Sequence, residues 1–387
     1  MNPVGAVDRF VRCSPLESAA GWIYGLEPAS SLPRPLLGPY AALERALLPA
    51  LEHPPCYVTF SGGRDSSAVL ATATALARRV GLPLPVPVTR RYPDDPATDE
   101  SEWQQSVVQH LRLSEWVRLI YRKGETDLLG QAAREGLQLD GPLWPPALHT
   151  HRAMYRELDP GALVTGEGGD AVLGDRRGTP ITTLCSGRPR FTAAKRAAAA
   201  SLPKPVRQRR LARDAQNALH SRWLQPGALA EHSRRIAEDA ASEPLRFDTG
   251  TWYLTRIRAF RTLAHNHASV AAEYKLQAFE PLLDPGFITS LAHAGGRRGF
   301  GDRTAIMKTL FSDVLPSAVL ERSTKAAFNR VYTGQATRDF AKEWDGSGVD
   351  PDLVDIERLR AVWLSDRPTM ATGVLLHSAW LASAGRA

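Results

Sequence analysis

The segment Cys56–Val80, CYVTFSGGRDSSAVLATATALARRV, constrains the fold more than any other stretch of the chain. A short run of β-branched and aromatic residues at Tyr57–Phe60 predicts a buried strand, and the apolar spacing of Ser66–Val80 predicts a helix. A helix that begins directly after a tight glycine turn offers unpaired backbone N–H groups at the positive end of its dipole. The segment therefore predicts an anion-binding loop between a strand and a helix.

The glycines and serines of this loop are suited to binding an anion. Its glycines let the backbone adopt left-handed conformations and approach a ligand closely, and its hydroxyls add hydrogen-bond donors. The candidate binding residues are Ser61, Gly62, Gly63, Ser66 and Ser67.

Asp65 stands out in this loop because a carboxylate repels phosphate unless a cation lies between them. Asp65 therefore predicts a Mg²⁺ ligand that also contacts phosphate oxygens. The alternative is an ordinary turn in which Asp65 and Ser66 cap the helix.

A second strand followed by a glycine turn with carboxylates is predicted at Ala162–Asp170, ALVTGEGGD. In an open parallel sheet, ligands bind at the carboxyl ends of the strands, so two such loops can face one crevice. Asp65 and Asp170 would then supply the one or two carboxylates that Mg²⁺ typically takes, with water and phosphate oxygens completing its coordination.

Strands alternate with helices from about residue 55 to 175. Further strands are predicted at Val86–Arg91, Trp116–Tyr121 and Ala162–Thr165, and helices at Ala42–Glu52 and about 100–111. This alternation predicts an α/β fold, a parallel sheet flanked by helices. Beyond about residue 220 the pattern is mostly helical. We expect an N-terminal lead-in over 1–50, an α/β core over 51–185, and a mostly helical region over 186–387 that completes the site.

Composition limits the class of protein further. The three cysteines, Cys13, Cys56 and Cys185, are far apart and predict neither a disulfide framework nor a cysteine-rich metal site. The N-terminus has charges where a signal peptide would be apolar, and no apolar run is long enough to span a bilayer. We therefore expect a cytoplasmic protein without membrane association. The net charge of +7 is compatible with an anionic ligand.

The two loops carry a resemblance to a known family. SGGRDSS at Ser61–Ser67 and TGEGGD at Thr165–Asp170 resemble, in order and spacing, the synthetase domain of the asparagine synthetase family, which includes β-lactam synthetases and lasso-peptide cyclases. FEPLLDPGF at Phe279–Phe287 is similar to the Pro-Phe-Leu-Asp segment of that family. LPSAVLERSTKAAFN at Leu315–Asn329 is similar to its Leu-Pro…Arg-x-x-Lys-x-x-Phe segment. The similarity covers roughly residues 50–335 and implies an adenine-nucleotide α-hydrolase-like fold with a pyrophosphatase loop.

The resemblance implies ATP-dependent amide formation with Mg²⁺. A carboxylate would attack the α-phosphate of ATP, pyrophosphate would leave, and an amine would attack the acyl-adenylate. Lys325 aligns with the family's catalytic lysine and would supply a fixed cation. Glu167 would orient the carboxylate or handle the amine proton, or simply shape its loop.

The same resemblance implies the residues that meet the nucleotide. Val88, with Thr89, would contact the adenine, and Thr165 and Gly166 would line the nucleotide. Val88 could equally be a core residue of the sheet.

Two departures from the family bear on the substrates. We expect no glutaminase domain, because only about 50 residues precede the first predicted sheet strand. Gln277–Phe279 replaces a Glu-Ala-Arg sequence that could bind a small amino acid. Glu280 and Glu273 are acidic alternatives nearby.

The substrate is therefore expected to be a small-molecule or peptide carboxylate. The amine is either ammonia, from solution or a separate glutaminase, or an amine of the substrate itself. In the second case a ring would form, as in lasso-peptide cyclases and other natural-product enzymes, with a separate peptide-recognition protein as a possible partner.

Two other functions remain as alternatives. The basic segment Arg188–Arg213 is either a solvated surface or a docking face, and in the second case the chain would adenylate a tRNA base. The GEGGD loop and the lack of paired cysteines argue against nucleic acid as a substrate. A non-catalytic scaffold is the remaining alternative, and the joint presence of Asp65, Asp170 and Lys325 argues against it.

Overall fold

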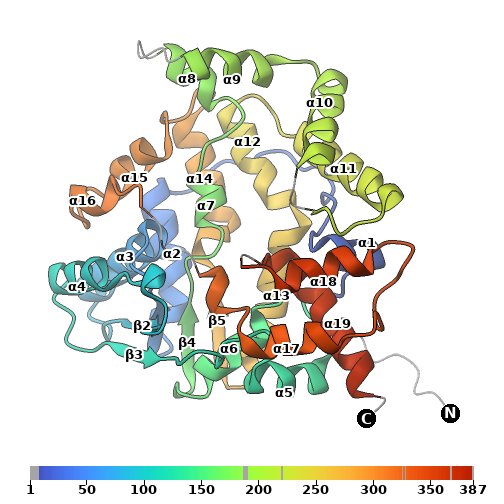
Figure 1. Ribbon diagram of the computed structural model, residues 1–387. Coiled ribbons are helices and arrows are strands. Elements are labelled where there is room, and N and C mark those ends of the chain that lie inside the picture. Colours follow the sequence, from blue (N-terminus) through green and yellow to red (C-terminus); the bar gives the residue numbers. More distant parts are fainter. Residues whose placement is uncertain are drawn as a thin grey trace.

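A five-stranded parallel sheet forms the centre of the protein (Figure 1). The structure is a computed structural model that describes residues 8–185, 191–218, 221–324, 326, 328–366 and 368–385. The strand order is β3-β2-β1-β4-β5. The strands are β1 (Cys56–Thr59), β2 (Val86–Arg91), β3 (Val117–Ile120), β4 (Gly161–Val164) and β5 (Leu276–Phe279).

Helices surround the sheet and build most of the C-terminal half. The α-helices are α1 (Pro15–Ala20), α2 (Pro39–Leu51), α3 (Arg64–Val80), α4 (Ser101–His110), α5 (Gln131–Asp140), α6 (Leu148–Tyr155), α7 (Gly169–Val172), α8 (Thr179–Cys185), α9 (Phe191–Ser201), α10 (Lys204–Asn217), α11 (Pro226–Ala241), α12 (Phe247–Tyr253), α13 (Arg258–Ala272), α14 (Pro285–Gly295), α15 (Arg303–Phe311), α16 (Ser317–Leu320), α17 (Gln335–Glu343), α18 (Ile356–Leu364) and α19 (Gly373–Ala384). Short 3-10 turns are η1 (Pro96–Thr98), η3 (Leu254–Arg256), η4 (Pro281–Leu283), η5 (Asn329–Val331) and η6 (Met370–Thr372).

The predicted α/β fold class is confirmed. β2 has the predicted bounds, and β1, β3 and β4 lie within one residue of theirs at each end. The prediction was incomplete in one respect: β5 lies in the region expected to be mostly helical. It pairs with β4 in parallel, with Val164 opposite Phe279, and forms one edge of the sheet.

The alternation of side chains along the strands divides the core into two layers. Val58 of β1 and Val164 of β4 pack with α2, α3 and α14 on one face. Tyr57 and Leu163, which point the other way, pack with α6 and α13 on the opposite face. Each large aliphatic side chain fully buried in these layers contributes about 1.5–3 kcal/mol to folding. The sheet is therefore covered on both faces, and the carboxyl ends of its strands are left for ligands.

A third apolar core lies away from the sheet. It joins residues of the N-terminal lead-in, of α5, of the start of α11 with the segment before it, and of the C-terminal helices. Trp223, just before α11, and Trp363 of α18 are fully buried in it. The C-terminal helices α18 and α19 thus pack together with α1 and α5, which are far from them in sequence (Figure 1). Among the described residues, no helix has both the length and the apolar character needed to cross a membrane.

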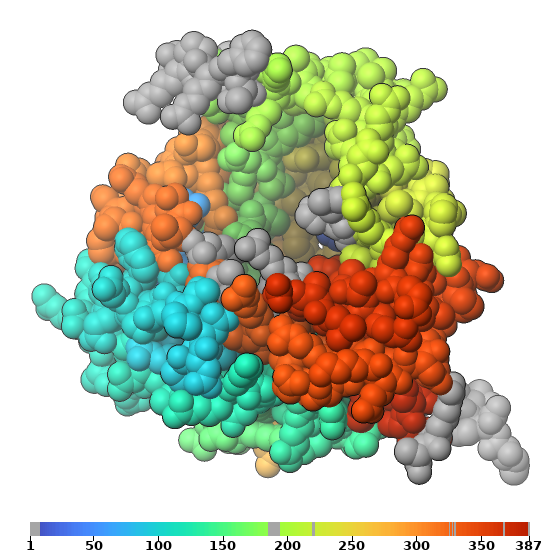
Figure 2. Space-filling view, in the orientation of Figure 1, coloured from blue at the N-terminus to red at the C-terminus, as the bar shows by residue number. Residues whose placement is uncertain are grey.

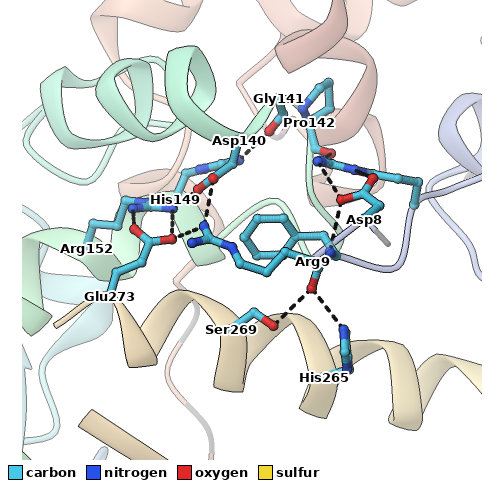
Figure 3. Close-up of polar contacts among 12 residues, drawn as sticks. Asp8, Arg9, Asp140, Gly141, Pro142, His149, Arg152, His265, Ser269 and Glu273 are labelled. Carbon is cyan, nitrogen blue, oxygen red and sulfur yellow. Dashed lines mark hydrogen bonds and ion pairs between the residues drawn. The ribbon is translucent and has the colours of Figure 1, made fainter. Parts of the chain in front are cut away.

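A buried cluster of charged side chains connects α5, α6 and α13. Arg152 of α6, which is 1% exposed, forms ion pairs with Asp140 at the end of α5 and with Glu273 just after α13 (Figure 3). Arg9 of the N-terminal segment contacts the same two acids, and its carbonyl oxygen accepts a hydrogen bond from Ser269 of α13. These charges join segments from four parts of the sequence.

Candidate active site

A cleft of about 650 Å³ opens at the carboxyl ends of β1, β2 and β4. Its walls include the loops that follow β1 and β4 and the start of α15. Further lining residues are Arg322, Ser323, Thr324, Ala326, Phe328 and Tyr332. Figure 2 shows that this side of the molecule is hollowed between the yellow-green helices α9–α11 and the red C-terminal helices. Both glycine loops predicted from the sequence thus face one crevice.

The first loop is shaped by its own hydroxyl groups. The Oγ atoms of Ser61 and Ser66 lie 3.1 Å apart, and Ser61 Oγ accepts a hydrogen bond from the backbone N–H of Gly63 at 3.3 Å. Gly62 has a φ of +85°, a conformation that favours glycine. α3 begins at Arg64 after Gly63, and no side chain caps it. Asp65 and Ser66 lie in the first turn of α3 and line the cleft, so the unpaired N–H groups of this turn offer a position for an anion.

The second loop packs tightly against the first. Gly168 has a φ of +80°, and a Cβ at this position would lie 2.2 Å from a methyl carbon of Leu283. A Cβ at Gly169 would lie 2.5 Å from the carboxyl carbon of Asp65. Glycine at 169 thus lets the Asp65 carboxylate rest directly on the second loop.

Gly169→Ala is expected to slow the pyrophosphate release from ATP that the sequence resemblance implies by about 100-fold, because the added methyl group displaces the Asp65 carboxylate by about 1 Å. Steady-state rates with Mg²⁺-ATP would measure the loss. Gly227→Ala on α11 is the matched control, since a Cβ there meets nothing within 4 Å. A G169A rate equal to wild type would contradict the close packing of the two loops.

Asp65 and Asp170 come together on the guanidinium of Arg303. Arg303 Nη2 lies 2.6 and 2.7 Å from the two carboxylate oxygens of Asp65, and Nη1 lies 2.5 Å from Asp170 Oδ1. Sequence analysis missed Arg303, which is the first residue of α15 and belongs to none of the motifs. Its position shows that the two acids share one guanidinium in the cleft.

This pair of carboxylates fits a Mg²⁺ ion. Mg²⁺ needs hard oxygen ligands and usually takes only one or two carboxylates, with the remaining positions filled by water and phosphate. The described residues contain no group of three or more His, Cys, Asp or Glu side chains arranged to hold a metal. A metal here would therefore depend on the nucleotide for further ligands.

Glu167 lies in the cleft between groups of both signs. Its side chain is accessible to solvent, yet the protein around it raises its pKa by partial desolvation. The neighbouring His267 and the guanidinium of Arg90 oppose this rise in pKa, and the negative charges of Glu280 and Asp170 add to it. A carboxylate with a raised pKa is suited to accept a proton near neutral pH.

The two acidic alternatives near β5 have different positions. Glu280 follows β5 and forms a hydrogen bond of 2.5 Å with Nδ1 of His267, beneath the cleft and close enough to act on Glu167. Glu273 lies in the Arg152 cluster instead. Glu280 is therefore the one of the two that influences the site.

Residues on either side of Lys325 in the sequence form contacts with the walls of the cleft. Arg322 pairs with Glu100, and its Nη1 donates a hydrogen bond of 2.9 Å to the carbonyl oxygen of Gly62. Glu100 also accepts a hydrogen bond of 2.9 Å from the backbone N–H of Ala326. Thr324 and Ala326 line the cleft, whereas Lys325 itself lies outside the described residues.

Several other predicted residues lie in or beside the cleft. Ser61, Gly63, Asp65, Ser66, Val88, Gly166, Glu167 and Asp170 line it. Four others support this lining rather than belonging to it: Gly62, Ser67, Thr89 and Thr165. Ser67 is fully buried beneath the loop, and Thr89 Oγ1 donates to the Phe60 carbonyl oxygen at 2.9 Å.

The basic segment 188–213 is only partly described, because residues 186–190 lie outside the described residues. Within α10, Arg207 is buried and its guanidinium donates to backbone carbonyls at the end of α11. This arginine therefore links α10 to the end of α11 and does not belong to a solvated surface.

A parallel sheet with an anion-binding loop after β1 and an acidic glycine loop after β4 defines a nucleotide-binding α/β protein. The asparagine synthase family model matches residues 42–382. The chain therefore belongs to the asparagine synthase family and is an ATP-dependent carbon–nitrogen ligase, with an adenylating domain of the asparagine synthase type. No curated protein matches its sequence.

Proposed function

We propose that this ligase adenylates a carboxylic acid larger than aspartate and joins it to an amine. The observation that carries the proposal is the meeting of the α3 N-terminus, Asp65, Asp170 and Glu167 in one cleft. In the first step a carboxylate oxygen bonds to the α-phosphorus of ATP, and pyrophosphate leaves. In the second step the amine bonds to the acyl carbon, AMP leaves, and the amine gives up a proton.

The residues of the chain divide this work. The N–H groups of the first turn of α3 and the hydroxyls of Ser61 and Ser66 bind the phosphates. Asp65 and Asp170 would hold Mg²⁺, which would supply positive charge against the departing pyrophosphate. Lys325 adds a fixed positive charge to the same leaving group. Val88 packs against the adenine on the floor of the cleft.

Glu167 takes the proton of the amine in the second step. Because protonated Glu167 cannot act as a base, amide formation is expected to fall at low pH. The midpoint of this fall should lie above the usual glutamate pKa, since the protein around Glu167 raises its pKa.

Glu167→Gln is expected to slow amide formation by about 100-fold and to remove this acidic limb of the pH profile. Single-turnover measurements, with pyrophosphate release followed separately, would locate the loss in the second step. The exposed Glu157→Gln is the control. An equal loss in both steps would contradict a base role and favour orientation of the carboxylate.

The size of the substrate is inferred from a second cavity. A space of about 530 Å³ lies beside the cleft, and Tyr92 lines both. Arg122, Lys123, Arg330 and Arg338 contribute positive charge to its walls, and Asp94, Asp95 and Asp366 contribute negative charge. This second cavity could accommodate the part of a polar substrate, such as a peptide, that lies beyond the reacting carboxylate.

This second cavity favours ring closure as the alternative within the class. There the amine belongs to the same peptide or amino-acid derivative as the carboxylate, and a peptide-recognition protein would deliver the substrate. If ammonia is the amine, it comes from solution or from a separate glutaminase.

Pyrophosphate release from Mg²⁺-ATP, with AMP as co-product, tests the proposal. The acids to compare are aspartate with ammonia, and linear peptides that carry an amine and a side-chain carboxylate. We expect release with the peptides and little with aspartate. Release that requires aspartate and ammonia would establish asparagine formation and contradict the larger substrate, and ATP cleavage to ADP would contradict adenylation.

A further inference from the structure

The first glycine loop is held from outside by two side chains to which the proposed reaction gives no role. Gln104 Nε2 donates a hydrogen bond of 3.1 Å to the carbonyl oxygen of Ser61. Arg322 Nη1 donates one of 2.9 Å to the carbonyl oxygen of Gly62. Both side chains are buried in the wall of the cleft. Two consecutive carbonyl oxygens of the loop are thus fixed by residues from distant parts of the sequence.

One face at the start of α4 supports both donors. Glu100, Trp103 and Gln104 are at helical spacing, so their side chains lie on the same side of the helix. Arg322 forms an ion pair with Glu100, and its guanidinium lies over the Trp103 ring at 4.7 Å. A Cβ at Gly62 would lie 3.0 Å from Gln104 Cγ, so the loop rests directly on this face.

Arg322 is engaged by the protein through each of its guanidinium nitrogens. Nη1 binds the Gly62 carbonyl oxygen, Nη2 pairs with Glu100, and Nε donates a hydrogen bond of 2.9 Å to Thr324 Oγ1. An acid therefore balances the buried charge of Arg322. Its position in the wall is explained by the loop and by α4, without a contact to an anionic ligand.

The side chain of Gln104 uses only one of its two polar atoms. In the part of the chain that the structure describes, its Oε1 is shielded from solvent and makes no hydrogen bond. Leaving a buried amide oxygen unpaired lowers stability, and an apolar side chain of the same length would avoid that loss. The bond to Ser61 is therefore the feature that an amide provides at this position.

Holding a carbonyl oxygen also fixes the direction of the N–H group that follows it. A trans peptide group is planar, and its C=O and N–H bonds point in opposite directions. The N–H of Gly62 therefore points away from Gln104, and that of Gly63 points away from Arg322. Glycine could otherwise adopt other backbone conformations, because it has no Cβ. A peptide group that rotated would turn the negative end of its dipole toward an anion in the loop.

We propose that Gln104 and Arg322 are positioning residues of the phosphate loop, which hold its carbonyl oxygens against the protein and so direct its N–H groups toward the phosphates of ATP. This inference rests on the proposed function, which assigns those phosphates to the loop. Because the two side chains act through the backbone of Ser61–Gly63, their effect falls on the phosphate part of the ligand and not on the adenosine part.

Calorimetric titration with two ligands tests this role. The ligands are the non-hydrolysable α,β-methylene analogue of ATP, in the presence of Mg²⁺, and adenosine, which lacks phosphates. We expect Gln104→Met, which keeps the length of the side chain without the amide, to lower the affinity for the analogue by about tenfold and to leave the affinity for adenosine unchanged. The exposed Gln105→Met on the same helix is the matched control and should change neither affinity.

Arg322 requires a paired substitution, because Arg322→Met alone leaves the Glu100 carboxylate buried without its counter-charge. The double variant Glu100→Gln/Arg322→Met removes both charges, and the amide at position 100 keeps an oxygen for the backbone N–H of Ala326. We expect the same selective loss of affinity for the analogue, and thermal unfolding would verify that the fold is kept.

An unchanged affinity of Q104M for the analogue would overturn the proposal, and so would an equal loss of affinity for the analogue and for adenosine. Wild-type protein that binds the two ligands equally well would overturn both this proposal and the assignment of the phosphates to the loop. A selective loss in Q104M without pyrophosphate release from any acid would instead contradict the proposed function and leave the positioning role intact.

Discussion

Asp65→Asn is expected to reduce pyrophosphate release by about 1000-fold, which corresponds to about 4 kcal/mol of lost transition-state stabilisation. The Asp65 carboxylate shares Arg303 with Asp170, and the two form the acidic pair that would hold Mg²⁺. An asparagine has the same size but carries no charge, so it balances neither the guanidinium nor a metal ion. Asp170→Asn should have a similar effect, because its carboxylate meets the same guanidinium.

The fold of D65N should be preserved, because no side chain caps α3 and Asp65 is not needed to begin it. Circular dichroism and thermal unfolding would verify this. Glu44→Gln, which breaks the Arg79 ion pair outside the cleft, controls for the loss of a partly buried carboxylate. A D65N rate within about threefold of the wild type would remove Asp65 from the proposed metal site.

Arg152→Met is expected to lower the free energy of unfolding by about 3–5 kcal/mol. Arg152 is almost completely buried between Asp140 and Glu273, so its removal leaves two carboxylates that are neutralised mainly by the half-exposed Arg9 (Figure 3). Burial already raises the pKa of Asp140, and Arg152 opposes that effect. Without Arg152 the pKa rises further, so the stability deficit should shrink as the pH falls and the carboxylate becomes protonated.

Urea unfolding of R152M at two pH values would measure both effects. The control is Arg156→Met just after the same helix, where the ion pair with Glu135 is open to solvent and little change is expected. An unchanged midpoint for R152M, or a deficit that grows at low pH, would contradict a stabilising role of this buried cluster.

Four of the five strands could be predicted from the sequence because each is a short apolar run bounded by turn residues and followed by a helical pattern. β5 could not, since Leu276–Phe279 begins soon after α13 ends at Ala272 and lies in a stretch whose pattern is mostly helical. Its pairing with β4 depends on a contact between residues more than 100 positions apart, and periodicity within a window carries no information on such contacts.

Only those residues of the candidate site that belong to sequence motifs could be predicted. The meeting of Asp65 and Asp170 follows from parallel strands whose carboxyl ends share one edge. Arg303 reaches the site from α15, and nothing in its local sequence distinguishes it. Glu280 was named from the sequence as one of two acidic alternatives, and only the tertiary structure separates it from Glu273. Arg90 lies inside the predicted strand Val86–Arg91, and only the tertiary structure shows that it lines the cleft.

The late position of β5 in the sequence has a consequence for biosynthesis. A ribosome releases the N-terminal strands first, so β4 emerges well before Leu276–Phe279 can pair with it. During that interval β4 is an open edge, and open edges can pair with other chains. Glu280 and Arg303, which complete the surroundings of the cleft, emerge later still. The nucleotide cleft is therefore among the last parts of the protein to form, and a nascent chain needs protection from aggregation until most of its length has been made.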